Sequence, residues 1–265
     1  LIATLFKDVI TRVTKNFPIL NLFGPKGSGK SEMGHSLTSF FIVKNNPPNL
    51  QSTTKAALGE AVAQVSNAIV HLDEYKNSLD IDKIEFLKGL WDGTGRDRMN
   101  MDRDKKREMT RVDSGIVLSG QEMPTADIAL FSRMIFLTFS VTTHTKEEGN
   151  RFKELKRIEA NGLTHLTNQM LSYRHKVELD FGNCRDRATA DLMQQLGGRP
   201  VEDRTLLNWV TPIAAFLCVE NELQLPFTYQ DVLRIAADGI VDQEAKTRQN
   251  NELSGFWVTV ENLVR

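Results

Sequence analysis

The sequence predicts an α/β fold in which a parallel sheet is followed by an all-helical region. The apolar run at residues 18–23 leads directly into a glycine-rich loop and then into a helical pattern at 31–41. A second apolar run, at 68–72, ends in two acidic residues. From Thr145 onward, apolar residues recur almost wholly with helical spacing. Strands that alternate with helices form parallel sheets, so we expect a core domain at 1–141 and an all-α domain at 142–265.

Composition and charge narrow the class of protein. The chain has 265 residues, a net charge of −1 and 40% apolar residues, which is typical of a globular protein. The near-zero charge gives no overall attraction to nucleic acid, so any such contact must come from a local patch. No apolar run is long enough to cross a bilayer, and we expect a cytoplasmic protein that does not contact membranes. The chain begins and ends inside amphipathic patterns, so we expect it to be part of a longer polypeptide.

The loop after the first strand matches the phosphate-binding pattern G-x-x-x-x-G-K-[ST] without a mismatch. Its residues are Gly24, Pro25, Lys26, Gly27, Ser28, Gly29, Lys30 and Ser31. Glycine has no Cβ, so the backbone N–H groups can turn inward around a chain of phosphates. Lys30 can reach the β- and γ-phosphates, and the Ser31 hydroxyl can bind Mg²⁺. The loop therefore predicts that the chain binds ATP with Mg²⁺.

Asp73 and Glu74 follow the second apolar strand and complete this site. We expect Asp73 to hold Mg²⁺ through its water shell, and Glu74 to orient and polarise the attacking water. A water-activating carboxylate beside the metal-binding acid indicates hydrolysis of ATP. Between the two motifs we expect a weak strand at 49–51 and a helix at 55–66, with Thr53 or Thr54 as its N-cap.

A charged segment precedes the next strand. Residues 96–102 and 107–112 alternate as strands do, and residues 103–106 are typical of a turn. This pattern predicts a β-hairpin with a basic tip. Its candidate contacts to nucleic-acid phosphates are Arg103, Lys105, Lys106 and Arg107. The alternative is a solvated polar hairpin, since most charge runs are solvated faces.

Two further strands carry candidate catalytic residues. The strand at 116–121 ends at Gln121, our first choice for a sensor of the γ-phosphate, with Ser119 as the second choice. The alternative is that Gln121 only begins a turn. The strand at 134–139 is preceded by Arg133, which could stabilise the transition state on a nucleotide bound by a neighbouring subunit. The alternative is a solvated arginine at the end of a strand.

The remaining sequence predicts helices that form a lid, which packs on the nucleotide and on the next subunit. Apolar stripes run through 163–177 and 206–217, with breaks expected at Gly162, 181–183, 197–200 and Pro226. Thr228 is the expected N-cap of a helix from 229 past 240. Arg204 begins the helix with the second stripe and could contact phosphate as a second sensor, although an ordinary arginine at a helix start fits equally well.

Together, these motifs resemble those of the superfamily 3 helicases, the AAA+-related motors of viruses and plasmids. They are most similar to the helicase-like domains of primase-helicase proteins from phages and mobile elements. The resemblance covers roughly the first half of the chain. It is carried by residues 24–31, 73–74, 96–112, 119–121 and 132–139. The chain departs from the family at Gln121, where an asparagine is common.

The resemblance implies an AAA+-like P-loop ATPase core whose β-hairpin precedes the sensor strand. It also implies ATP hydrolysis, a hexameric ring and movement along single-stranded DNA. We therefore expect the motor domain of a replicative or mobile-element DNA helicase, with a fused or associated primase module, in a bacterial or phage-infected cell. The alternative is an ATPase switch or loader that acts on DNA or protein without unwinding. A small-molecule kinase and a non-hydrolysing scaffold fit the acidic pair less well.

Overall fold

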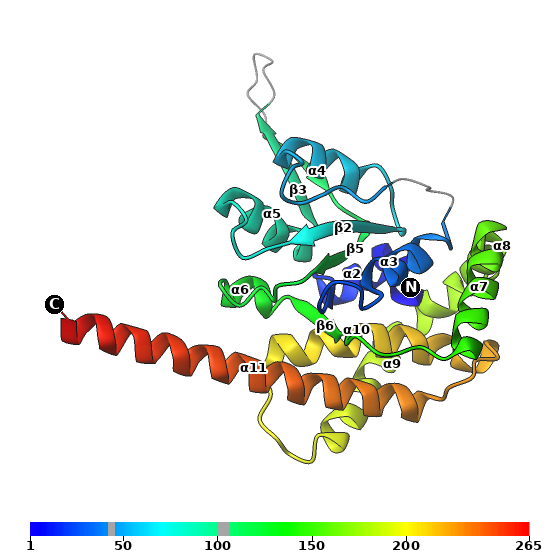
Figure 1. Ribbon diagram of the computed structural model, residues 1–265. Helices are drawn as coiled ribbons and strands as arrows, with labels where there is room; N and C mark the ends of the chain where they lie inside the picture. The colour runs from blue at the N-terminus through cyan, green and yellow to red at the C-terminus, as the bar shows by residue number, and fades with distance from the viewer. Residues whose placement is uncertain (42–45, 100–106, 265) are drawn as a thin grey trace.

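The computed structural model describes the backbone of residues 1–41, 46–99 and 107–264, and their side chains except those of 96–110 and 250–264. Within this part of the chain, four strands form a parallel sheet in the order β2-β5-β1-β6 (Figure 1). The strands are β1 (Ile19–Phe23), β2 (Ile69–Tyr75), β5 (Gly115–Gly120) and β6 (Met134–Thr138). Because all four run in the same direction, their carboxyl ends meet at one edge, where α/β proteins bind ligands.

The register of the strands fixes which loops meet at that edge. Leu22 in β1 pairs with Ser119 in β5 on one side and with Leu137 in β6 on the other. The backbone N–H of Gly24 donates to the carbonyl of Gly120, at 3.4 Å. The glycine loop therefore begins beside the end of β5.

Helices on one side of the sheet enclose an apolar core. They are α4 (Lys55–Ala63), α5 (Ile81–Trp91) and the short α6 (Ile128–Phe131). This core includes Leu58, Leu72, Leu87 and Phe131, all buried. Thr54 caps α4, as its side chain accepts the N–H of Ala57 at 3.3 Å.

The weak strand expected at 49–51 is reduced to an isolated parallel bridge between Asn49 and Asp73. Two prolines, Pro47 and Pro48, immediately precede it, and proline has no N–H to donate to a ladder. The Nζ of Lys83 donates to the carbonyl of Leu50 at 2.8 Å, so α5 holds this segment in place of a longer ladder.

A separate antiparallel ribbon joins β3 (Thr94–Met99) to β4 (Arg107–Arg111), with Met99 opposite Arg107. Figure 1 shows the ribbon projecting past the β2 side of the sheet, away from the C-terminal helices. Its strands agree with the alternation at 96–102 and 107–112. The candidate phosphate contacts Arg103, Lys105 and Lys106 lie outside the described residues, as does the side chain of Arg107.

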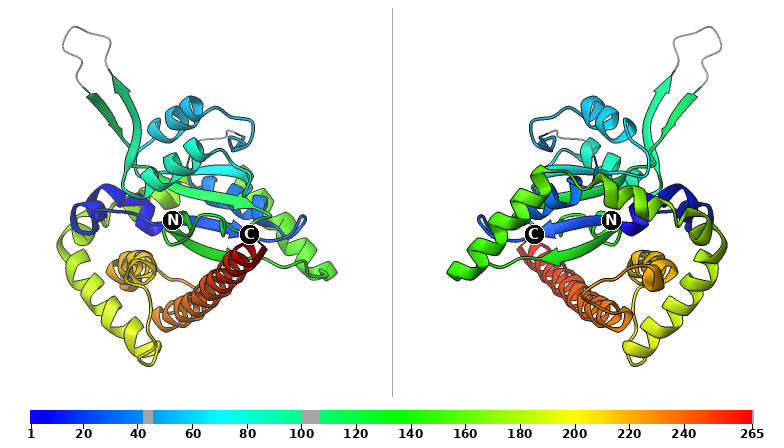
Figure 2. Two further views of the ribbon diagram at one scale, coloured as in Figure 1. Left: turned by 90° about the vertical axis from the view of Figure 1, so that its left-hand side faces the viewer. Right: turned by 90° about the vertical axis from the view of Figure 1, so that its right-hand side faces the viewer.

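Of the C-terminal helices, the last two pack against β6 (Figure 2), and the first lies beside Ser36, which donates to Glu159. In chain order, these helices are α7 (Lys146–Ala160), α8 (Thr164–Leu171), α9 (Arg174–Gln195), α10 (Asp203–Val219), a 3₁₀ turn (Glu220–Glu222) and α11 (Tyr229–Val264). The expected N-cap at Thr228 is present, because its hydroxyl accepts the N–H of Asp231 at 3.3 Å. The break expected at 181–183 is wrong. Helix α9 runs through it because Phe181 is buried in the helical core and Gly182 has open space beside it.

The N-terminal helices belong to the same core as the C-terminal ones. Helices α1 (Ile2–Leu5), α2 (Lys7–Thr14) and α3 (Lys30–Thr38) precede and follow the glycine loop. Leu5 and Phe6 share a buried apolar cluster with Val210 and Ile213 of α10. The division at 141/142 therefore stays a prediction, since packing joins the start of the chain to the helical region.

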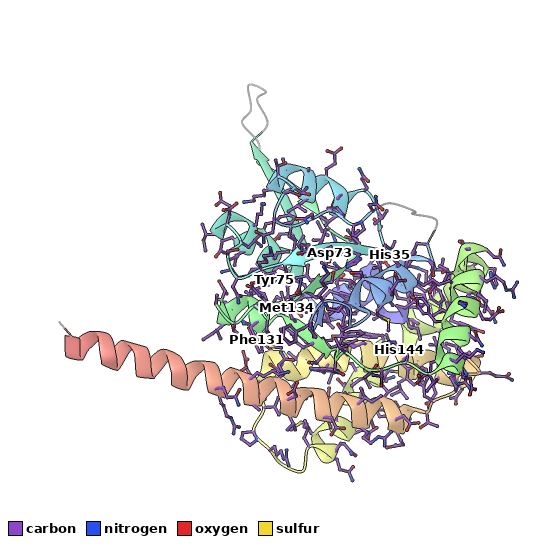
Figure 3. The ribbon with its side chains drawn as sticks, in the orientation of Figure 1. His35, Asp73, Tyr75, Phe131, Met134 and His144 are labelled. Carbon is purple, nitrogen blue, oxygen red and sulfur yellow. The ribbon has the colours of Figure 1, made fainter. Side chains whose placement is uncertain are left out.

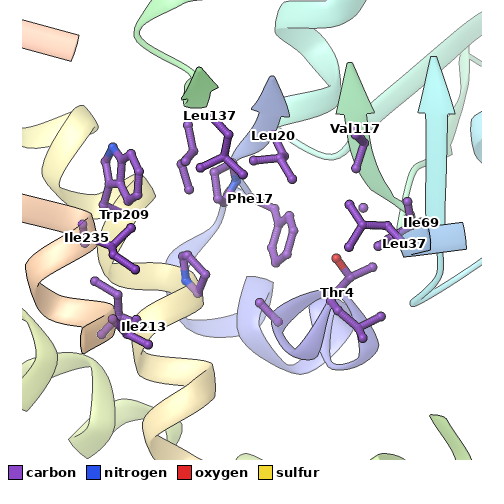
Figure 4. Close-up of a pocket in the computed structure, with 18 of the residues that line it drawn as sticks. Thr4, Phe17, Leu20, Leu37, Ile69, Val117, Leu137, Trp209, Ile213 and Ile235 are labelled. Atoms are coloured by element: carbon purple, nitrogen blue, oxygen red, sulfur yellow. The ribbon is translucent and has the colours of Figure 1, made fainter. Parts of the chain in front are cut away.

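An apolar cavity of about 410 Å³ lies between the sheet, α1 and α10 (Figure 4). Leu20, Val117 and Leu137 line it from the strands, and Trp209 and Ile213 line it from α10. None of the residues 24–31 lines it, so this cavity is separate from the glycine loop. No helix in the described part of the chain has the length and apolar character needed to cross a membrane.

Candidate nucleotide-binding site

The glycine loop has the backbone shape that a phosphate cradle requires. Gly27 and Gly29 have φ angles of 78° and 90°, in the left-handed region that favours glycine, and the space beside each is open. At Gly24, a Cβ would collide with the carbonyl oxygen of Phe139. The last two residues of the loop, Lys30 and Ser31, begin α3, so the loop leads into the N-terminus of a nine-residue helix. This arrangement is suited to an anion.

Lys30 is buried and bends back over its own loop. Its Nζ donates to the carbonyl of Pro25 at 2.7 Å and lies 3.4 Å from the Ser28 hydroxyl. Burial lowers the pKa of Lys30, and the nearby carboxylates of Asp73 and Glu74 act in the opposite direction. The structure thus brings the lysine of the first motif close to both acids of the second.

Asp73 and Glu74 lie where the pairing of β2 with β5 becomes irregular. The register shifts between Leu72 and Tyr75, so the two acids form a bulge at the end of the strand. Glu74 has a φ angle of 63°, which is uncommon for a residue with a side chain. Bulges re-aim side chains and are frequent beside active sites. Here the bulge places two half-buried residues, Asp73 and Glu74, at the carboxyl end of β2, the edge of the sheet that carries the loop.

Ser119 joins Asp73 to His71 in a chain of hydrogen bonds. The Ser119 hydroxyl donates to Oδ1 of Asp73, and the Nε2 of His71 lies 2.6 Å from that hydroxyl. Since the hydroxyl has one proton, His71 must donate through Nε2–H. Burial lowers the pKa of His71, and the negative charge of Asp73 acts in the opposite direction. Sequence reasoning named Ser119 only as a second choice and assigned His71 no role in the site.

Gln121 directly follows β5 and is exposed. Its neighbour Gly120 accepts the N–H of Gly24, so Gln121 lies beside the glycine loop. No hydrogen bond joins its side chain to another described side chain. Ser119 is the residue of this strand that contacts Asp73. The assignment of Gln121 as sensor stays a prediction.

Arg133 and Arg204 lie at the opposite edge of the sheet. Met134 pairs with Ile19, the first residue of β1, whereas the glycine loop follows the last, so Arg133 is separated from the loop by roughly 13 Å of strand. Arg204 donates through its NH1 to the hydroxyl of Ser132 at 2.7 Å, which places it beside Arg133. In Figure 3, Asp73 lies on β2, whereas Met134, the residue that follows Arg133, lies on β6.

The oxygen groups near the loop suit Mg²⁺. Ser31 is exposed at the start of α3, and Asp73 has one oxygen held by Ser119. A hydroxyl and a carboxylate are hard ligands, and Mg²⁺ is usually bound by one or two protein groups together with water and phosphates. Among the described residues, no group of three or more His, Cys, Asp or Glu side chains could hold a metal ion. The donor set thus fits a magnesium ion that arrives with a nucleotide.

No family model and no curated protein matches the chain. Among solved structures, the active helicase Cch of SCCmec type IV matches with a TM-score of 0.69 and 15% identity, over 93% of this chain and 48% of that chain. A JCV helicase matches with a TM-score of 0.34 and 11% identity, over 80% and 64%. A complex of magnesium chelatase subunits BchI and BchD matches with a TM-score of 0.37 and 12% identity, over 88% and 98%.

The match to Cch is the one of these three that supports a conclusion about the fold. At 15% identity it establishes a common architecture and nothing finer, and the chain spans about half the length of that helicase. The shared architecture is a parallel sheet followed by a helical region. The chain therefore shares the fold of that structure over 93% of its length.

Proposed function

We propose that the chain is the ATP-hydrolysing motor domain of a ring-forming DNA helicase that couples hydrolysis to movement on single-stranded DNA. The observation that carries the proposal is that Lys30 follows the end of β1 while Asp73 and Glu74 end β2, and both strand ends flank β5 at the carboxyl edge of the sheet. A helix N-terminus, a buried lysine and two carboxylates are the groups that phosphoryl transfer to water requires.

Each residue has a separate task in this proposal. The loop N–H groups and Lys30 bind the phosphates, where the phosphate oxygens replace the Pro25 carbonyl as partners of Nζ. Ser31 and Asp73 would hold Mg²⁺, which supplies charge neutralisation on the phosphates. Glu74 accepts a proton from the attacking water. Ser119 and His71 fix the orientation of the Asp73 carboxylate.

The position of Arg133 supports assembly. It lies at the edge of the sheet far from the loop of its own chain, so it can serve as a catalytic arginine only for a nucleotide bound by a neighbour. A head-to-tail contact that repeats and closes forms a ring, and we propose a hexamer. A second copy of the chain is therefore the first partner.

The ribbon β3–β4 is the proposed nucleic-acid contact. It precedes β5, and the candidate sensor Gln121 directly follows that strand, so we assign the ribbon as the pre-sensor hairpin. With a net charge of −1, the chain can bind DNA only through a local patch, and the basic tip at 103–107 supplies one. A primase module elsewhere in the same polypeptide or complex, and a cytoplasmic location in a bacterial or phage-infected cell, complete the proposal.

The test is steady-state ATP hydrolysis by the full-length protein, with and without single-stranded DNA. We expect Lys30→Ala and Glu74→Gln each to lower hydrolysis by about 100-fold or more, while Glu74→Gln still binds ATP. The matched controls, Lys55→Ala and Glu60→Gln, change exposed residues of the same type on α4 and should keep full activity.

The outcomes separate the candidates. Retained turnover in Lys30→Ala would exclude this site as the ATPase centre. Hydrolysis that DNA stimulates, together with strand displacement, supports the helicase. DNA-stimulated hydrolysis without strand displacement would instead support a switch or loader.

A further inference from the structure

Trp91 is the point where three elements meet. It is the last residue of α5 and is buried, with a 9% exposed fraction. Its Nε1–H donates to Oδ1 of Asn208 on α10 at 2.9 Å, and the Asn208 amide donates to the carbonyl of Ser132 at 2.9 Å. These two bonds tie the ring to the turn that precedes β6.

Two arginines face this ring. The guanidinium carbon of Arg133 lies 5.3 Å from the ring centroid, and that of Arg204 lies 5.4 Å away. Arginine at this distance from an indole is attracted by the negative face of the ring. The Trp91 indole thus lets two positive charges lie near each other, and Asn208 holds the indole in place.

Among the described residues, each arginine side chain makes one hydrogen bond. Arg133 donates through NH1 to the Ala129 carbonyl at 2.6 Å, while its Nε is buried without a partner. Arg204 donates through NH1 to the Ser132 hydroxyl. A guanidinium group has five N–H donors, and no carboxylate among the described side chains pairs with either arginine. Both side chains are half-buried, so each can still reach a group from outside the chain.

We propose that Trp91 is a positioning residue that holds Arg133 and Arg204 as a pair for the phosphates of a nucleotide bound by the adjacent subunit. This inference rests on the proposed function, because it needs a neighbour with an occupied site. It gives Arg204 a role between subunits, in place of a second sensor for the nucleotide of its own chain. The planar N–H groups of a guanidinium suit phosphate oxygens.

The experiment is a subunit-mixing ATPase assay with the full-length protein. A subunit with Trp91→Leu keeps its own loop and acids but misplaces the arginines that serve its neighbour. A subunit with Lys30→Ala keeps the arginines but cannot use its own site. When the two variants are mixed in equal amounts, roughly a quarter of the random interfaces join an intact loop to an intact arginine pair.

We expect Trp91→Leu alone to lower kcat at least about tenfold, as loss of a catalytic arginine does, with ATP affinity unchanged. Mixing with Lys30→Ala should restore hydrolysis. Trp91→Phe keeps an aromatic face and should retain most activity. Arg204→Ala, which leaves the core intact, should behave like Trp91→Leu in kcat, in ATP affinity and in the mixture.

The control mixture is Arg133→Ala with Lys30→Ala. If this mixture regains activity and the Trp91→Leu mixture does not, the positioning role is overturned while the proposed function stands. If Arg204→Ala weakens ATP binding by its own subunit, the role between subunits is also overturned. Turnover that persists in Lys30→Ala alone signals the separate failure of the proposed function.

Discussion

The backbone of Glu74 shows how a single residue can be set for chemistry at a cost in stability. Its φ angle of 63° lies in the left-handed region, which costs a residue with a Cβ roughly 1–2 kcal/mol. The bulge between Leu72 and Tyr75, with β5 paired on both sides of it, holds the conformation in place. Such strain gathers at functional positions. Here the strained residue is the proposed base, at the end of β2.

Lys7 allows a prediction about pH at the same scale. The residue is buried, and its Nζ donates to the Ser114 carbonyl at 2.7 Å. Burial lowers the pKa of Lys7 to about 8 from its ordinary 10.5. Asp113 opposes this shift and Arg111 adds to it. Between those two values the unfolded chain holds the proton and the folded chain does not, so the stability that Lys7 contributes rises with pH.

We expect the free energy of unfolding of the wild type to gain roughly 2 kcal/mol between pH 7 and 9.5, relative to Lys7→Met. Urea unfolding at both pH values measures this difference. Burial raises the pKa values of Cys218 and Tyr75, so these two residues make the free energy of unfolding fall as the pH rises. Both residues are present in the wild type and in Lys7→Met, so their effect cancels in the comparison. The exposed Lys15→Met is the control and should follow the wild type. If the free energy of unfolding changes with pH by the same amount in Lys7→Met and in the wild type, the pKa of Lys7 is not lowered.

At the scale of elements, α3 and β2 are held together by a close approach of backbone to side chain. Gly34 lies in the middle of α3, where a Cβ would run into the ring of His71 on β2. That ring holds Ser119, which in turn holds Asp73. The helix that begins at the glycine loop is therefore packed directly onto the strand that carries the acids.

This packing predicts that Gly34→Ala destabilises the protein by about 1–3 kcal/mol, even though alanine is the better helix former. It should also lower ATPase activity, because the His71 ring must move. The matched control is Gly182→Ala in α9, where nothing lies near the added methyl group. There we expect a gain of roughly 0.5–1 kcal/mol. Thermal unfolding of both variants measures the difference in stability. If Gly34→Ala and Gly182→Ala shift the melting temperature equally, the close contact between Gly34 and the His71 ring is contradicted.

The elements that sequence reasoning predicted well are those with a local signal. The glycine pattern, the apolar strands β1, β2, β5 and β6, and the cap at Thr54 each depend on a few neighbouring residues. The failures depend on contacts distant in sequence. Helix α9 continues through 181–183 because Phe181 is buried, and the segment at 49–51 pairs only at Asn49.

The same division applies to the candidate site. The loop and the acids could be read from their spacing, whereas the link from His71 through Ser119 to Asp73 depends on strand register. Trp91 was missed altogether, because its role depends on two arginines that are distant in sequence. The sequence signal that could have drawn attention to Trp91 is its position: Asp92 and Gly93 follow it, directly before the charged ribbon.

At the scale of the whole molecule, the proposed contacts to DNA fall in the sequence at residues 103–107, which follow β3 and include the first residue of β4. The ribbon projects on the side away from the C-terminal helices (Figures 1 and 2), and the net charge of the chain is only −1. Binding to a phosphate backbone releases counterions, so its dependence on salt counts the contacts made. The basic residues near the tip should therefore set this dependence.

Replacing both tip lysines, Lys105→Ala with Lys106→Ala, should weaken binding to single-stranded DNA and leave ATPase activity without DNA intact. The plot of log binding constant against log salt should become less steep by about 1.4, since each contact to a single strand contributes about 0.7. The control pair, Lys146→Ala with Lys153→Ala, removes two exposed lysines from α7. Both pairs change the net charge from −1 to −3, because each removes two positive charges. A difference in slope between them would thus come from the position of the charges. If both pairs keep the wild-type slope, the tip is a solvated surface, and the DNA contact must lie elsewhere on the chain.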